Sequence, residues 1–180
     1  PAENAAGAPT EATGSPVAPG VDKQLRDPGR PAADAEFREA VTLMNKGRIE
    51  ESMGRLRKAL ALSPGHDQAR QMLVALLVER RDREAARREL EAALDLNPQQ
   101  IGFASLLARL LVDLGDSSGA LEVLERHAPY ASAHPQYRSF QGALLRRAGR
   151  HAEAAREFRA ALAINPNVGP WRSEEHTSEL

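Results

Sequence analysis

The sequence is short of several features that would define its class at once. It contains no cysteine, which excludes disulfide bridges and thiolate metal ligands and leaves the cellular compartment open. No apolar run reaches the roughly 20 residues of a membrane-spanning helix, the longest being MLVALLV at residues 72–78. Aromatic residues are only 4% of its 180 residues. A chain with few aromatics and much alanine and leucine favours close-packed helices, because alanine and leucine have high helix propensity.

The chain also lacks an excess of charge of either sign. Its 24 basic and 25 acidic residues give a formal net charge of -1, too weak a field to attract nucleic acid or an anionic membrane. The arginine-rich stretch at residues 79–91 is interleaved with acids. Glu79 with Arg83 and Glu84 with Arg88 have the i, i+4 spacing of helical ion pairs, so we expect a solvated helix face there rather than an RNA-binding surface.

Residues 1–32 are rich in proline, alanine and glycine and show almost no apolar periodicity. Such a segment cannot bury enough apolar surface to offset the entropy lost on ordering. We therefore expect a disordered linker over residues 1–32, with residues 21–27 as a candidate for a short ordered patch. The sequence begins with Pro1 and carries no signal peptide, and we interpret it as a fragment.

From residue 33 onward the sequence repeats with a period of 34 residues. Within each period, apolar residues recur three and four positions apart in two successive stretches, which indicates two amphipathic helices. The tight turn between them falls near Gly47, Arg81, Gly115 and Gly149. A proline near the end of most units stops the second helix, since it lacks a donor and clashes with the preceding turn. The pattern predicts an all-α fold with eight helices over residues 33–166, in four antiparallel hairpins.

These units resemble the tetratricopeptide repeat (TPR), whose pattern requires small or apolar residues at positions 4, 7, 8, 11, 20, 24 and 27 and a proline at position 32. The resemblance implies a right-handed α-solenoid. Small residues at positions 8 and 20 would let the paired helices cross closely. The predicted array over 33–171 has units at 33–66, 67–100, 101–134 and 135–168, followed by the start of a truncated fifth unit at Gly169.

Two units depart from the pattern. Glu36 and Glu39 take positions 4 and 7 of the first unit, as expected of a terminal, solvent-facing unit. In the third unit His127 replaces the alanine of position 27, and Pro129 precedes the usual stop. We expect the second helix of this unit to end around Arg126 and the stretch HAPYASAH to form an extended connection.

The sequence carries no pattern that indicates catalysis, a cofactor or a metal. Ser63, His66 and Asp67 are neighbours in one inter-repeat turn and cannot face one another as a catalytic relay must, so a plain turn is expected. His127 and His134 have no carboxylate or cysteine at metal-binding spacing, which favours a turn-proximal histidine over a ligand pair. The sequence therefore predicts a protein that is not an enzyme.

The remaining functional surface is the concave groove that stacked hairpins form, lined by the first helix of each unit. The resemblance implies that positions 2, 5, 9 and 12 of each unit face it. These residues are apolar toward the first unit and basic toward the last, which suits an extended or helical protein segment with an acidic group near Arg109 and Arg146. The predicted groove residues are Phe37, Val41, Met44, Gln68, Gln71, Ala75, Val78, Ser105, Arg109, Val112, Gln136, Ser139 and Arg146.

Several segments also resemble the TPR protein of bacterial MSHA-type (mannose-sensitive haemagglutinin) type IV pilus biogenesis. They are VDKQLRD, ARQMLVALLVERRDREAARRELEAALDLNP, LERHAPYASAHPQY and PNVGPW. That resemblance implies an anchor in the inner membrane, a periplasmic linker and an assembly scaffold on the periplasmic face. The alternatives are a general adaptor or co-chaperone in the cytoplasm and, in third place, a regulatory domain cut from a larger enzyme.

The last nine residues, RSEEHTSEL at 172–180, do not continue the repeat. A fifth unit would place Glu175 and His176 at positions 7 and 8, where burying unpaired charge is costly. The stretch is identical to one translated frame of a common sequencing-library adapter, so we interpret it as an artefactual tail. Trp171 lies 34 residues after Tyr137 and is interpreted as the first anchor of the truncated unit.

Deletion of residues 172–180 should change the free energy of unfolding by no more than about 0.5 kcal/mol, the usual limit for surface changes. Denaturant unfolding of the full chain and of the chain ending at Trp171 measures the difference. A large loss on deletion would show that the tail is a genuine cap of the array.

Overall fold

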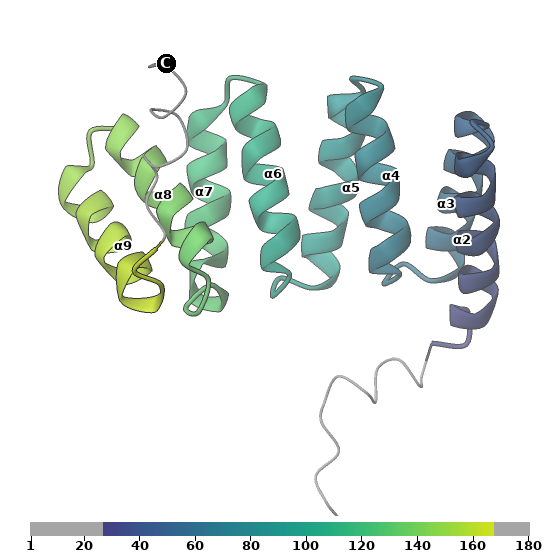
Figure 1. Cartoon of the computed structure of the whole chain (residues 1–180), viewed down its shortest axis with the longest axis horizontal. Coiled ribbons are helices and arrows are strands. Elements are labelled where there is room, and N and C mark those ends of the chain that lie inside the picture. The colour runs from purple at the N-terminus through teal and green to yellow at the C-terminus, as the bar shows by residue number, and fades with distance from the viewer. Residues whose placement is uncertain (1–26, 168–180) are drawn as a thin grey trace, which may run out of the picture.

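The computed structural model describes residues 27–167, which form eight α-helices stacked in a row (Figure 1). No strand occurs within that range, so the predicted all-α class is confirmed. A short 3-10 helix, η1 (Ala128–Tyr130), follows the sixth α-helix. The α-helices are α2 (Arg30–Asn45), α3 (Ile49–Leu62), α4 (Asp67–Glu79), α5 (Arg83–Leu96), α6 (Ile101–Asp113), α7 (Ser117–His127), α8 (Pro135–Arg147) and α9 (His151–Ile164).

Consecutive helices pair as hairpins, α2 with α3, α4 with α5, α6 with α7 and α8 with α9. The turn within each hairpin contains one residue in the left-handed region, namely Gly47 (φ 74°), Arg81 (φ 61°), Gly115 (φ 86°) and Gly149 (φ 77°). This conformation is free of strain for glycine and costs another residue roughly 1–2 kcal/mol. The predicted turn positions are therefore confirmed, and three of the four carry the residue that the geometry favours.

The two helices of each hairpin approach closely at positions 8 and 20. In the first hairpin the Ser52 hydroxyl donates a hydrogen bond to the Ala40 carbonyl across the pair, at 2.8 Å. In the fourth, a Cβ atom added to Gly142 would lie 2.9 Å from a ring carbon of Phe158. The expected close crossing is confirmed, since all eight residues at these positions are buried: Ala40, Val74, Ala108 and Gly142 with Ser52, Ala86, Ala120 and Ala154.

An ion pair between positions 4 and 23 also joins the helices in three hairpins. The pairs are Glu36–Arg55 (2.9 Å), Arg70–Glu89 (2.8 Å) and Arg138–Glu157 (2.9 Å). Glu36 therefore takes the same role as the arginines of later units, with the charges reversed. Hydrogen bonds from Lys58 and then Arg55 hold the pKa of the Glu36 carboxyl below its usual value. Glu36, which departs from the repeat pattern at position 4 of the first unit, therefore forms a contact within its hairpin.

An aromatic side chain at position 3 attaches the fourth unit to the third. Phe103 and Tyr137 are both buried. The Tyr137 hydroxyl donates to the Leu124 carbonyl of α7 at 2.7 Å, and burial raises the pKa of that hydroxyl above its usual value. Trp171, the third member of this series, lies outside the described residues, as do the tail at 172–180 and residues 1–26 of the expected linker.

The third unit is irregular where the sequence indicated. Helix α7 ends at His127, within one residue of the expected Arg126. The expectation of an extended connection is wrong at its start, where the chain forms η1 instead. Proline is tolerated in the first turn of a helix, and Pro129 occupies that place in η1. The His127 side chain is buried, with Nδ1 2.7 Å from the Pro98 carbonyl oxygen.

The expected ion pairs around the second turn are wrong. Helix α4 ends at Glu79 and α5 begins at Arg83, so these two side chains belong to different helices. Glu84 lies 3.6 Å from Arg87, and no ion pair with Arg88 forms within residues 27–167. The turn at Arg81 separates Glu79 from Arg83, whereas Glu84 and Arg88 share α5 and Glu84 lies near Arg87 instead.

Substituting Gly142 with valine should lower the free energy of unfolding by about 1–3 kcal/mol, because the new side chain overlaps the Phe158 ring. The matched control is Gly54→Val in α3, where a Cβ atom would meet nothing within 4 Å. The control should change stability by less than about 0.5 kcal/mol. Equal effects of the two substitutions in denaturant unfolding would contradict the close crossing at Gly142.

Candidate peptide-binding groove

The predicted groove residues all lie on accessible faces of the four first helices, α2, α4, α6 and α8. In α4, for example, Leu73 and Leu77 are buried while Gln71, Ala75 and Val78 are exposed. None of the thirteen residues is buried. Six are half-buried, namely Phe37, Val41, Met44, Ser105, Val112 and Ser139, and seven are exposed, namely Gln68, Gln71, Ala75, Val78, Arg109, Gln136 and Arg146.

Side-chain contacts connect each first helix to the first helix of the next unit. Asp67 at the start of α4 accepts a hydrogen bond from the Gln100 amide, just before α6, at 2.8 Å. The Arg109 guanidinium of α6 lies 5.9 Å from the centre of the Phe140 ring of α8, within cation–π range. These contacts indicate that the exposed faces of neighbouring first helices adjoin one another.

His66 holds the start of α4 against α2. Its side chain is fully buried, and Nδ1 accepts a hydrogen bond from the Ala69 amide at 3.2 Å, which caps the helix. Because Nδ1 accepts, the ring proton resides on Nε2. Nε2 lies 3.0 Å from the Asp34 carboxylate, but the two groups are not aligned for a hydrogen bond. The ring also packs on Phe37, with the two centres 5.1 Å apart.

The turn predicted from Ser63 to Asp67 is confirmed, but the burial of His66 was not predicted. A signal was available in its place directly before the first helical residue, where a side-chain acceptor caps the helix. The Ser63 hydroxyl donates a hydrogen bond to the carboxylate of Asp27.

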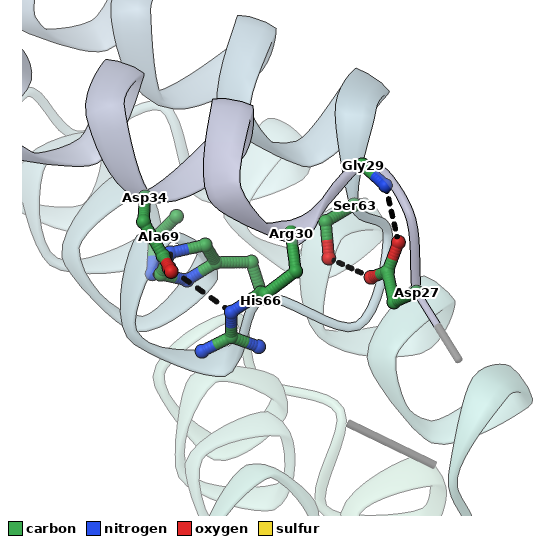
Figure 2. Close-up of polar contacts among 7 residues, drawn as sticks. All are labelled: Asp27, Gly29, Arg30, Asp34, Ser63, His66 and Ala69. Carbon is green, nitrogen blue, oxygen red and sulfur yellow. Dashed lines mark hydrogen bonds and ion pairs between the residues drawn. The ribbon is translucent and has the colours of Figure 1, made fainter. Parts of the chain in front are cut away.

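Hydrogen bonds also join the segment just before α2 to the region around Ser63 and His66 (Figure 2). The Asp27 carboxylate accepts from the Gly29 amide at 3.0 Å and from the Ser63 hydroxyl, and Arg30 Nε donates to Asp34 at 3.0 Å. Gly29 has no room for a side chain, because a Cβ atom would overlap the Leu62 carbonyl oxygen. These contacts join the beginning of α2 to the end of α3.

A hollow of about 640 Å³ lies beside Asp27 and Arg30, and Gln68 of the predicted groove belongs to its lining. It lies between the start of α2, the turn before α4 and the turn before α6. Its lining residues are Asp27, Arg30, Pro64, Gly65, Asp67, Gln68, Arg70, Ala93, Leu96, Asn97 and Gln100.

Residues 27–167 contain no group of three histidine, aspartate or glutamate side chains that could hold a metal ion. His127 Nδ1 lies 2.7 Å from the Pro98 carbonyl oxygen, whereas His134 is exposed at the start of α8. None of the helices in this range combines the length and the apolar character that crossing a bilayer requires.

Stacked helical hairpins with an accessible face on their first helices define an α-solenoid of the kind that presents a surface to other proteins. The model of the tetratricopeptide repeat family matches residues 43–100 and 77–144, which together span more than half of the sequence. The chain therefore belongs to the tetratricopeptide repeat family.

Solved structures of MamA share this fold. A crystal structure of MamA has 19% sequence identity and a TM-score of 0.62, over 81% of this chain and 84% of MamA. MamA 41-end from Desulfovibrio magneticus RS-1 has 19% identity and a TM-score of 0.58, over 80% and 79%. At this identity the likeness concerns the fold alone. No curated protein matches the chain, so the resemblance to a pilus protein depends on the segments quoted above.

Replacing His66 tests whether its side chain caps α4. His66→Ala removes both the cap of α4 and the ring that packs on Phe37, whereas His66→Asn keeps a side-chain acceptor for the Ala69 amide. The alanine variant should be less stable than the asparagine variant by about 1 kcal/mol, the usual value of a helix cap. Denaturant unfolding at neutral pH measures both, and equal stability would show that His66 does not cap α4.

Proposed function

We propose that the chain is a non-enzymatic scaffold whose groove binds a segment of a partner protein. The observation that supports this most is the division of each first helix into a buried face and an accessible face that carries the predicted groove residues. The first unit contributes half-buried apolar side chains from Phe37, Val41 and Met44. Val78 of the second unit is 45% exposed, so apolar surface remains that a partner could cover.

The charged end of the groove suits an acidic group on the partner. Within residues 27–167, Arg109 and Arg146 form no ion pair with an acidic side chain. The Arg109 guanidinium lies 5.9 Å from the centre of the Phe140 ring, a contact that favours this position of the side chain before any partner binds and so lowers the entropy cost of using it. A carboxylate could therefore pair with Arg109 without displacing a contact within the chain.

The setting that we propose is the assembly of a type IV pilus or a related secretion machine, at the periplasmic face of the inner membrane. The segments that resemble the MSHA-type TPR protein support this setting. A general soluble adaptor or co-chaperone is the alternative, and the generic character of the repeats supports it. The gene upstream of Pro1 distinguishes them, because an anchor segment favours the pilus setting, a soluble start favours the adaptor and a catalytic domain favours a fragment of an enzyme.

Charge reversal in the groove tests the proposed binding surface. The double substitution Arg109→Glu and Arg146→Glu should weaken binding of acidic partner segments at least tenfold, because attraction becomes repulsion. The matched control is Arg57→Glu and Arg88→Glu, which makes the same change of charge at exposed sites on the second helices α3 and α5.

Two-hybrid screening followed by calorimetry with the recovered segments measures the effect. Unchanged binding by the groove variant, or equal losses in groove and control variants, would place the binding surface elsewhere.

A further inference from the structure

The His66 side chain connects the turn before α4 to the apolar end of the groove. It is fully buried, and its ring packs on Phe37 of α2 with the two centres 5.1 Å apart. Its Nδ1 accepts from the Ala69 amide at 3.2 Å, and its Nε2 lies 3.0 Å from the Asp34 carboxylate (Figure 2). One ring therefore contacts the first turn of α4 and two side chains of α2.

This arrangement requires the neutral form of the His66 ring. Nδ1 can accept from the Ala69 amide only while it carries no proton, because a protonated imidazole has two donors and no acceptor. Proton uptake would place two donors against each other in a buried site and leave the Ala69 amide without its partner, which is costly. Histidine is the side chain that ordinarily changes its charge between about pH 5 and 8, so the change falls close to neutral pH.

The Asp34 carboxylate opposes this loss only in part. It is the one acidic group within 4 Å of the ring nitrogens among residues 27–167. Arg30 Nε donates to the same carboxylate oxygen at 3.0 Å, so the attraction of Asp34 is divided. The neutral ring already presents its Nε2 proton beside this oxygen, and proton uptake adds no further donor there. Because the Asp34 side chain is 41% exposed, water also weakens the charge attraction.

The other charged groups near His66 are engaged elsewhere. Asp27 and Asp67 accept hydrogen bonds from uncharged groups. Arg70 of α4 is paired with the Glu89 carboxylate. The last turn of α3 carries no charged residue. The ring therefore has no second counter-charge within residues 27–167, and proton uptake costs the folded chain more than it returns.

We propose that His66 is a positioning residue that holds Phe37 at the apolar end of the groove, and that it does so only while its ring is neutral. On proton uptake the ring leaves the Ala69 amide, so α4 loses its cap and Phe37 loses the side chain that packs on it. Acid thus loosens the contact between α2 and the start of α4, which connects the first unit to the second. The consequence for partner binding rests on the proposed groove function, because Phe37 belongs to the groove.

NMR of the full chain tests the proposal without any ligand. The ring nitrogen shifts of His66 report which nitrogen carries a proton, hydrogen exchange of the Ala69 amide reports the cap, and the Phe37 ring shifts report the packing of the two rings. All three are followed from about pH 7.5 to about pH 5. The matched variant is His66→Asn, which keeps an acceptor for the Ala69 amide but has no ring to protonate. Its response to pH measures the contribution of every other titratable group.

At the upper end of this range we expect a ring protonated only on Nε2 and an Ala69 amide protected from exchange. As the ring takes up a second proton, the protection factor of the Ala69 amide should fall about fivefold or more, the factor expected for the loss of one helix cap. The Phe37 ring shifts should move over the same range of pH. Neither the cap nor the Phe37 ring should respond in this way in His66→Asn.

Three results would overturn the proposal. One is a ring that takes up its proton while the Ala69 amide stays protected and the Phe37 shifts stay constant. Another is a ring that stays neutral down to about pH 5, the lower end of the range in which histidine ordinarily titrates. The third is an equal response to pH in the unmodified chain and in His66→Asn.

Calorimetry with a segment recovered by two-hybrid screening separates this inference from the groove function. Its affinity for the unmodified chain should fall about threefold to tenfold across the same range of pH, and its affinity for His66→Asn should change less. Binding that responds equally to pH in both chains would leave the groove function standing and overturn the role of His66 in it. Absence of binding to either chain at any pH would contradict the groove function, whereas the NMR results alone would still decide whether His66 positions Phe37.

Discussion

The stack depends on the close approach of the two helices within each hairpin. Small residues at positions 8 and 20 allow it, from Ala40 beside Ser52 to Gly142 beneath Phe158. A larger side chain at either position would push the helices apart, and the following unit would lose the surface onto which it packs. Because proteins are marginally stable, one such change removes a sizeable share of the total of about 5–15 kcal/mol. The same constraint, repeated every 34 residues, gives the molecule its regular form.

Because of this regularity, each first helix has one set of positions that packs within the stack and another that is available to a partner. Buried positions must repeat, whereas accessible positions are free to differ, and they change from apolar near Phe37 to basic near Arg146. The ion pair between positions 4 and 23 shows a third behaviour, since Glu36 with Arg55 reverses the charges of Arg70 with Glu89. The two charges of such a pair need only each other, so the acid and the base can exchange places from one unit to the next. The residues that recognise a partner can likewise differ between units.

The sequence predicted what depends on periodicity. The helices, the turns near Gly47 and Gly115 and the accessible faces all follow from spacing and from the rarity of positive φ in other residues. It did not predict contacts between distant segments, such as Asp27 with Ser63 or Arg109 with Phe140. Such contacts are known only once the segments are placed in space, and no spacing rule in one sequence contains that information.

The central claim is that the first helices, not the second, bind the partner. Amide chemical-shift mapping by NMR, on the full chain titrated with a partner segment recovered by two-hybrid screening, tests it most directly. The account predicts shifts concentrated in α2, α4, α6 and α8, with α3, α5, α7 and α9 little changed. Shifts concentrated on the outward faces of the second helices would contradict it.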